Sequence, residues 1–220
     1  LCNLAFLAFL DNQRSFKVGS FMSTTIAPDQ IDRIVWNQHH DPFEVLGPHT
    51  IEQDGKTVWV VRAYQPNADK VSVMLPERRA EYPMSSSHHP HFFECTIDIP
   101  ELSNYQLRIQ EGEHERVIYD PYAFRSPFLT EFDIHLFSEG NHHRIYEKLG
   151  AHLTTQNGVS GVYFAVWAPN ARNVSVLGDF NHWDGRKYQM RKGSSGVWEI
   201  FIPELTEGAH YKYEIKNAAG

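Results

Sequence analysis

One short pattern occurs twice in this chain, and this repeat constrains the fold more than any other feature. The pattern PNA-x-x-VSV spans residues 66–73 and returns at residues 169–176, 103 residues further along. A second pattern, IPEL, follows each copy, at residues 99–102 and again at residues 202–205. Self-similarity at a fixed spacing is typical of a structural unit that is used more than once. The sequence therefore predicts two copies of one module in tandem.

The residues around each copy predict that the module is built from β-strands. An aromatic and β-branched run at residues 162–167 stops at Pro169, which fixes φ and lacks a backbone donor. Residues 174–177 alternate as a second strand, and tyrosine leads a strand in each copy, at residues 105–109 and 211–215. Short strands separated by turn residues are the pattern of a β-sandwich. We expect an all-β chain with two tandem sandwich modules and a short N-terminal helix at residues 28–37.

Composition excludes several classes of protein. The formal net charge is −7, from 20 basic and 27 acidic residues, and Lys and Arg never cluster beyond a pair. Nucleic-acid binding proteins usually carry a basic patch, so we expect no nucleic-acid partner. Mean hydropathy is −0.45, and no apolar run reaches the ~18 residues that a spanning helix needs, so we expect no membrane partner. Only Cys2 and Cys95 are present, which favours a reducing cytoplasm over a disulfide framework.

Histidine is abundant, but its spacing does not predict a metal site. The 13 histidines include three groups: His39-His40, His88-His89-x-His91 and His142-His143. Adjacent histidines rarely face one ion, and no cysteine or carboxylate joins them at a zinc-site spacing. No phosphate-binding loop, dinucleotide fingerprint or nucleophile motif occurs either. We therefore expect no metal, no cofactor and no catalytic residue in this chain.

One loop distinguishes the second copy from the first. Residues 178–185, GDFNHWDG, form a turn rich in Gly, Asn and Asp that carries Trp183, whereas the first copy has only Leu75-Pro76-Glu77 there. Sugar rings have an apolar C–H face, which an exposed indole covers at low entropic cost. Trp183 is therefore the best candidate for a sugar-binding aromatic residue. Asp179 and Asp184 flank it and are expected to cap the turn rather than to catalyse a reaction.

The other tryptophans are expected to serve the structure. Trp36 is interpreted as packed at the edge of the first module, with a sugar platform as the alternative. Trp167 and Trp198 lie within strand patterns and are predicted to be core residues, and Trp59 is ambiguous.

The chain divides into four predicted segments: residues 1–21, residues 22–124, residues 125–159 and residues 160–220. Residues 1–21 precede Met22 and are interpreted as a non-native or disordered tail, with a targeting segment as the alternative. Residues 22–124 form the first sandwich, and residues 125–159 a connector too apolar for a free linker, so we expect it to pack between the modules. Residues 160–220 form a second sandwich that the repeat predicts to be incomplete.

Three longer segments of the sequence resemble a known family. Residues 39–49 (HHDPFEVLGPH), 120–124 (DPYAF) and 140–152 (GNHHRIYEKLGAH) are similar to the amino-terminal half of bacterial glycogen branching enzymes, and the resemblance covers residues 26–220. It implies two tandem immunoglobulin-like β-sandwich modules ahead of a catalytic barrel. It also implies transfer of α-1,4-glucan segments to 6-hydroxyls in glycogen synthesis. The family's two catalytic carboxyl groups lie on the barrel, and no residue of this chain matches them, so the chain alone is expected to be inactive.

The resemblance also implies particular binding residues. In related glycogen-binding modules the loop tryptophan stacks on glucose and a lysine of the following strand bonds a hydroxyl. These roles map onto Trp183 and Lys212, with Asn181 as a helper. The implied partners are α-glucan, as glycogen or maltooligosaccharides, and the downstream catalytic barrel. Three alternatives stay open: the loop packs on the barrel instead, the chain is a free-standing glycogen-binding or interaction module, or it is an inactive gene fragment.

Overall fold

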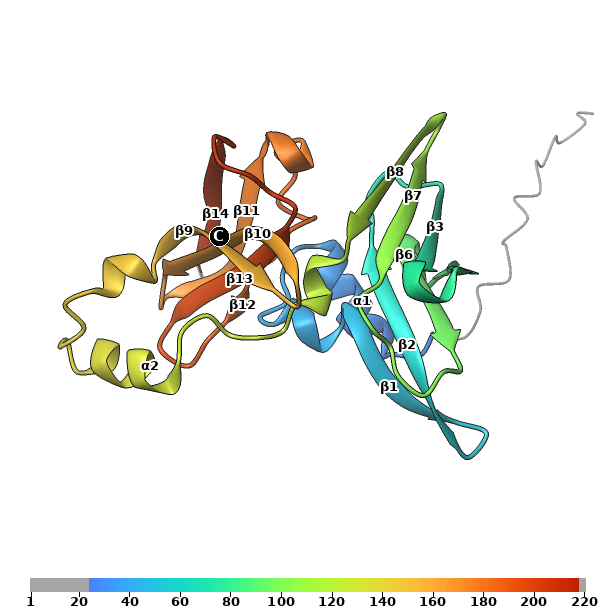
Figure 1. Ribbon diagram of the computed structural model, residues 1–220, viewed down its shortest axis with the longest axis horizontal. Coiled ribbons are helices and arrows are strands. Elements are labelled where there is room, and N and C mark those ends of the chain that lie inside the picture. The colour runs from blue at the N-terminus through green and yellow to red at the C-terminus, as the bar shows by residue number, and fades with distance from the viewer. Residues whose placement is uncertain (1–23, 218–220) are drawn as a thin grey trace, which may run out of the picture.

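The computed structural model describes residues 24–217 and shows two β-rich modules joined side by side (Figure 1). The segment predicted as a tail (1–21) lies outside the described residues. Among those described, no helix is long and apolar enough to cross a membrane. The predicted all-β class is confirmed, because α1 (Pro28–Val35) and α2 (Glu131–Ser138) are the only α-helices in this part of the chain.

The first module is a sandwich of two four-stranded antiparallel sheets. Its strands are β1 (Gly47–Gln53), β2 (Lys56–Tyr64), β3 (Lys70–Leu75), β4 (Ala80–Pro83), β5 (Ser85–Ser87), β6 (His89–Ile97), β7 (Gln106–Glu111) and β8 (His114–Tyr119). One sheet has the order β1-β2-β6-β5 and the other β4-β3-β7-β8. Apolar side chains from β2, β6, β3 and β7 fill the space between the sheets, as the alternation of buried residues along these strands requires.

The second module is smaller and less evenly divided. Its strands are β9 (Gly150–Gln156), β10 (Val159–Trp167), β11 (Ala171–Gly178), β12 (Arg191–Lys192), β13 (Val197–Pro203) and β14 (Tyr211–Asn217). Four of them form a sheet in the order β12-β13-β10-β9, and β11 pairs with β14. Because β9 pairs with β10 along its whole length, the sheet begins at Gly150, within the segment that the sequence analysis assigned to the connector.

Strand pairing confirms the internal repeat. The PNA turn lies between β2 and β3 in the first module and between β10 and β11 in the second. The VSV strand then pairs antiparallel with the tyrosine-led strand, so that β3 joins β7 and β11 joins β14. Equivalent sequence therefore forms equivalent structure in both copies.

The two modules share one hydrophobic core, with α1 lying at the seam between them (Figure 1). Ile31 and Ile34 of α1 are fully buried with residues of both modules, including Trp198 of β13. Polar contacts reinforce this seam: the Tyr122 hydroxyl accepts a hydrogen bond from the Gln189 backbone N–H at 3.0 Å. Residues of the first module therefore complete a cluster in the second, in addition to the first module's own core, and we expect the modules to unfold together.

The connector is packed rather than free. Its apolar side chains, together with Phe124 at its start, cover the outer face of β10 and β13, where Tyr163 and Phe201 are buried. Helix α2 lies at the end of the second module that is far from the first (Figure 1). The start of the connector thus lies in one cluster with Tyr119 and Phe124 of the first module and Tyr163 of the second, whereas α2 lies away from the seam that α1 occupies.

Two predictions about tryptophans were wrong. Trp36 is 69% exposed, so it is not packed at the module edge. Trp167 is 54% exposed, although its ring meets that of Phe137 of α2 in a T-shaped contact with centroids 5.9 Å apart, because it is the last residue of β10. Trp198 is fully buried, as predicted, and its indole donates to the Ala168 carbonyl at 2.9 Å. Trp59, ambiguous in the sequence, packs against the first module's core.

His49 is expected to make the stability of the chain depend on pH. Burial, followed by the charges of Arg125 and Arg62, lowers the pKa of His49 from 6.5 to about 4. Between pH 6.5 and 4, His49 is protonated in the unfolded chain but stays neutral in the folded chain. The contribution of His49 to stability is therefore complete above pH 6.5 and is lost as the pH falls toward 4. In urea unfolding, the free energy of unfolding of the unchanged chain should fall more between pH 7 and pH 4.5 than that of the His49→Gln variant.

The comparison with the variant is needed because Asp120 titrates in the same range with the opposite sign. Burial raises the pKa of this carboxyl to about 6, so its contribution to stability grows as pH falls. Equal pH dependence in the chain and in His49→Gln would contradict the assignment to His49.

Candidate carbohydrate-binding site

The loop after β11 holds Trp183 in an unusual backbone conformation. A single 3-10 turn (Asp179–Asn181) is followed by two left-handed residues, His182 with φ 57° and Trp183 with φ 59°. Left-handed φ is rare for bulky side chains and persists only where surrounding contacts impose it. Such local strain is concentrated at functional sites, which makes this loop the first place to look for one.

Asn181 supplies the contacts that impose the conformation. Its side chain is buried, accepts from the Gly178 N–H at 2.9 Å, and donates to the carbonyls of Val176 at 2.8 Å and Asp184 at 3.2 Å. Gly178 is needed beneath the loop, because a Cβ there would collide with the Phe180 ring and the His210 carbonyl. Buried contacts therefore hold the loop in its conformation without a ligand.

Trp183 is held at the surface by two further contacts. Its indole Nε1 donates to Asp179 Oδ1 at 2.9 Å, and the Lys212 ammonium lies 5.9 Å from the centre of its rings. The side chain is nevertheless 42% exposed. An indole fixed along one edge and open on part of its surface is suited to stacking on a flat apolar ligand, with an ammonium donor beside it.

Comparisons with known proteins place both modules. Residues 27–122 match the family described as "alpha-1,4-glucan branching enzyme GlgB, N-terminal domain". Residues 148–220 match "Carbohydrate-binding module 48 (Isoamylase N-terminal domain)". The chain therefore combines a GlgB-type N-terminal domain with a CBM48-type module, and across both it is homologous to the N-terminal region of GlgB branching enzymes. Trp183 and Lys212 therefore lie in a carbohydrate-binding module, on the loop and strand that the resemblance singled out.

Curated relatives of the chain carry the same description. It is 77% identical over 197 residues to "1,4-alpha-glucan branching enzyme GlgB" of Nostoc sp., which covers 90% of this chain and 26% of that protein. The enzyme of the same name from Thermosynechococcus vestitus is 72% identical over 196 residues, covering 89% and 26%. The chain thus spans about a quarter of the length of the curated relatives it matches.

Among solved structures, pullulanase type I from Bacillus subtilis in complex with maltose is 17% identical over 80% of this chain and 24% of that chain. The TM-score is 0.29, which does not establish a shared arrangement of the modules.

The GlgB-type chain brings together two of the three predicted site residues. Trp183 and Lys212 face one another at the surface, whereas Asn181 lies beneath them with its amide committed to backbone groups. The proposed role of Asn181 as a direct helper does not fit this burial. Its position fits a role in shaping the loop, and the contact that sequence reasoning missed is the bond from the Trp183 indole to Asp179.

Asn181→Ala tests this structural role. The change leaves buried backbone groups of Gly178 and Val176 without partners, which costs about 1–3 kcal/mol. We expect thermal unfolding at a clearly lower temperature than that of the unchanged chain. An unchanged unfolding temperature with weaker sugar binding would instead assign Asn181 to direct ligand contact.

The two carboxylates of the loop are engaged in structure, as expected. Asp179 accepts from the indole, and Asp184 accepts from the Arg186 backbone N–H at 3.0 Å and from its guanidinium at 2.7 Å and 2.9 Å. Burial alone would raise the pKa of Asp184, but the bonds and charge of Arg186 outweigh it and hold this pKa below its ordinary value. A carboxylate held ionised by an arginine is a poor general acid.

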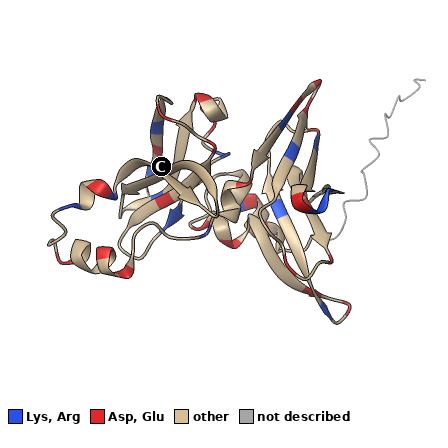
Figure 2. Ribbon diagram, viewed as in Figure 1, with Lys and Arg blue, Asp and Glu red and all other residues tan. Residues whose placement is uncertain are grey.

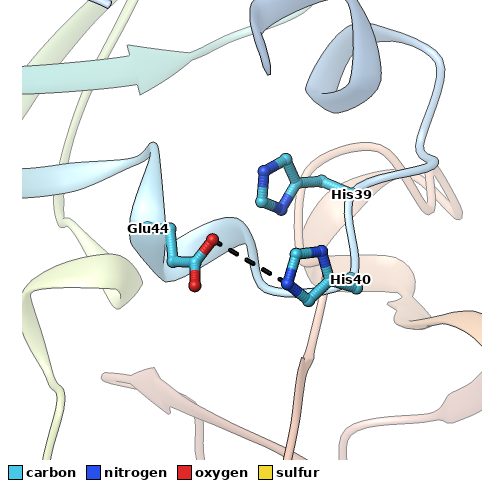
Figure 3. A group of neighbouring side chains, drawn as sticks. All are labelled: His39, His40 and Glu44. Atoms are coloured by element: carbon cyan, nitrogen blue, oxygen red, sulfur yellow. Dashed lines mark ion pairs between the residues drawn. The ribbon is translucent and has the colours of Figure 1, made fainter.

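One group of histidine and carboxylate side chains lies close enough together to suggest an ion. His39 and His40 stack with ring centroids 5.0 Å apart, and His40 Nε2 is 3.8 Å from Glu44 Oε2 (Figure 3). His39 is not available as a ligand, because Nε2 bonds Gln30 Oε1 at 2.9 Å and Nδ1 accepts from the Asp41 N–H at 3.1 Å. Burial, and then the charge of His40, lowers the pKa of His39, which favours this neutral form.

These residues therefore do not fit a metal without breaking structural bonds, and the absence of a metal stays a prediction.

Charged residues are interspersed over the surface, with Lys and Arg spread over both modules among Asp and Glu (Figure 2).

Proposed function

We propose that the chain binds α-1,4-glucan and positions it for the branching reaction of a 1,4-α-glucan branching enzyme. In that reaction an α-1,4-linked segment is transferred to a 6-hydroxyl, forming an α-1,6 branch in glycogen. The single observation that carries the proposal is the Trp183–Lys212 pair, an indole and an ammonium fixed side by side at the surface of a carbohydrate-binding module.

The chemistry of the pair suits a neutral polysaccharide. The indole offers an apolar surface to a sugar ring, and its torsions are already restricted by the bond to Asp179. Preorganisation of this kind lowers the entropic cost of binding. Lys212 supplies a donor for a hydroxyl at the edge of the same ring, and a neutral ligand needs no long-range attraction from a chain of net charge −7.

We propose that the chain does not catalyse the transfer by itself. A retaining transfer needs a carboxylate nucleophile and a second carboxyl group roughly 5–5.5 Å apart, with raised pKa for the acid. Asp179 and Asp184, the carboxylates nearest to Trp183, are bonded to the indole and to Arg186 instead. Catalysis then belongs to the part of the enzyme that the resemblance places after these modules.

Migration of the 220-residue chain through native gels tests the binding proposal. Gels containing glycogen should retard the chain, whereas gels containing dextran, an α-1,6-glucan, should not. A folded chain with equal mobility in glycogen and plain gels would contradict the proposal and would favour packing of the Trp183 loop on the catalytic barrel.

A further inference from the structure

Trp36 has no structural role that explains its exposure. It follows the last residue of α1, and 69% of its surface is open to solvent. A single exposed apolar side chain is common on protein surfaces, so a binding role for Trp36 must be argued from where its segment is held.

The backbone on both sides of Trp36 is fixed to the second module. The Ile34 carbonyl accepts from the Gln189 side chain at 2.9 Å. The buried Asn37 amide donates to Ser175 Oγ at 3.2 Å, to the Gly185 carbonyl at 3.4 Å and to Glu214 Oε2 at 3.3 Å. Trp36 therefore belongs to the first module by sequence but is held against the second.

The residues that hold this segment are neighbours of the Trp183 site. Gly185 lies two residues after Trp183 in the same loop, and Glu214 lies two residues after Lys212 in β14. Residues i and i+2 of a strand point to the same face and are about 6.5 Å apart. One face of β14 thus contacts Trp183 through Lys212 and the Trp36 segment through Glu214.

We propose that Trp36 is a second aromatic platform of the glucan site, so that one glucan chain is bound across the seam of the two modules. This inference rests on the proposed function and extends it, because it states that the site binds a glucan chain long enough to reach from Trp183 to Trp36. Trp183 and Lys212 serve the first glucose units, and Trp36 stacks on a unit further along the same chain. The first module then contributes to binding although its own copy of the loop has no tryptophan.

The proposal predicts that affinity grows with chain length only while Trp36 is present. Titration calorimetry with maltotriose and with maltoheptaose measures this gain in the unchanged chain, in Trp36→Ala and in Trp36→Tyr. The unchanged chain should bind maltoheptaose roughly tenfold more tightly than maltotriose, by analogy with the effect of one stacked base. Trp36→Ala should lose most of this gain, and Trp36→Tyr, which keeps an aromatic ring, should retain much of it.

The outcomes separate the two proposals. If the unchanged chain binds neither sugar, the proposed function itself fails. If it binds maltoheptaose and Trp36→Ala shows the same gain with length, only the composite site is overturned, and Trp36 is left as a contact for a protein surface. Trp167→Ala is the matched control, because Trp167 is a similarly exposed tryptophan at the opposite side of the second module, against α2.

Discussion

Replacing Trp183 with alanine is expected to weaken glycogen and maltoheptaose binding by about 1–3 kcal/mol, or roughly 5- to 150-fold, judged from the stacking of bases on aromatic side chains. The change removes the stacking surface and the cation–π partner of Lys212. The fold should survive it, because the loop is fixed by Asn181 rather than by the indole. Calorimetry with maltoheptaose measures the effect, and retardation in glycogen gels should be lost.

Trp183→Phe and Trp167→Ala serve as controls for this prediction. Phenylalanine keeps a stacking ring but loses the bond to Asp179, so binding should fall only in part. Trp167→Ala removes an exposed tryptophan from the same module and should bind as the unchanged chain does. Equal losses in Trp183→Ala and Trp167→Ala would show that the effect is not specific to the loop.

Trp198→Ala is expected to destabilise both modules by about 3–5 kcal/mol, the usual cost of emptying a large buried aromatic site. Trp198 is fully buried in the core that α1 and the second module share. Because Ile31 and Ile34 of the first module pack in the same cluster, the loss should lower the stability of both modules together. Urea unfolding monitored by amide hydrogen exchange in β2 and in β13 measures the stability of each module separately.

The unchanged chain should show one transition in both strands, shifted to lower urea by Trp198→Ala. Phe132→Ala, in the exposed part of α2, is the control and should change stability by less than about 0.5 kcal/mol. If β13 unfolds earlier in Trp198→Ala while β2 keeps its unchanged midpoint, the shared core is not a cooperative unit.

The repeat predicted the fold because local patterns decide strands. Alternation and the Pro-Asn turn specified β10 and β11 closely, and the repeat extended the same prediction to β2 and β3. What they could not specify is which face of a strand another segment covers. Trp167 shares a face with Tyr163 and Ala165 of β10, but those two are buried in the cluster with the connector, whereas Trp167 meets Phe137 of α2 and stays 54% exposed. The position of the connector is a tertiary property that the strand pattern does not contain.

The exposed residues of the site could be predicted from the sequence, but the buried residues that hold the loop in place could not. The loop composition and the family resemblance indicated Trp183 and Lys212, and the structure brings them together. The buried bonds of Asn181 and the two successive left-handed residues that follow it, His182 and Trp183, could not be predicted from residue propensities. The sequence left a sugar platform only as the alternative for Trp36, because its exposure depends on the docking of α1 on the second module.

The indole N–H signals of the five tryptophans in a two-dimensional NMR spectrum provide the most direct test of the account, with Trp183→Phe used to assign the Trp183 signal. On titration with maltoheptaose, we predict that the Trp183 signal moves while that of buried Trp198 stays in place. Binding that leaves the Trp183 signal unchanged would contradict the central claim that this loop is where the chain holds glucan.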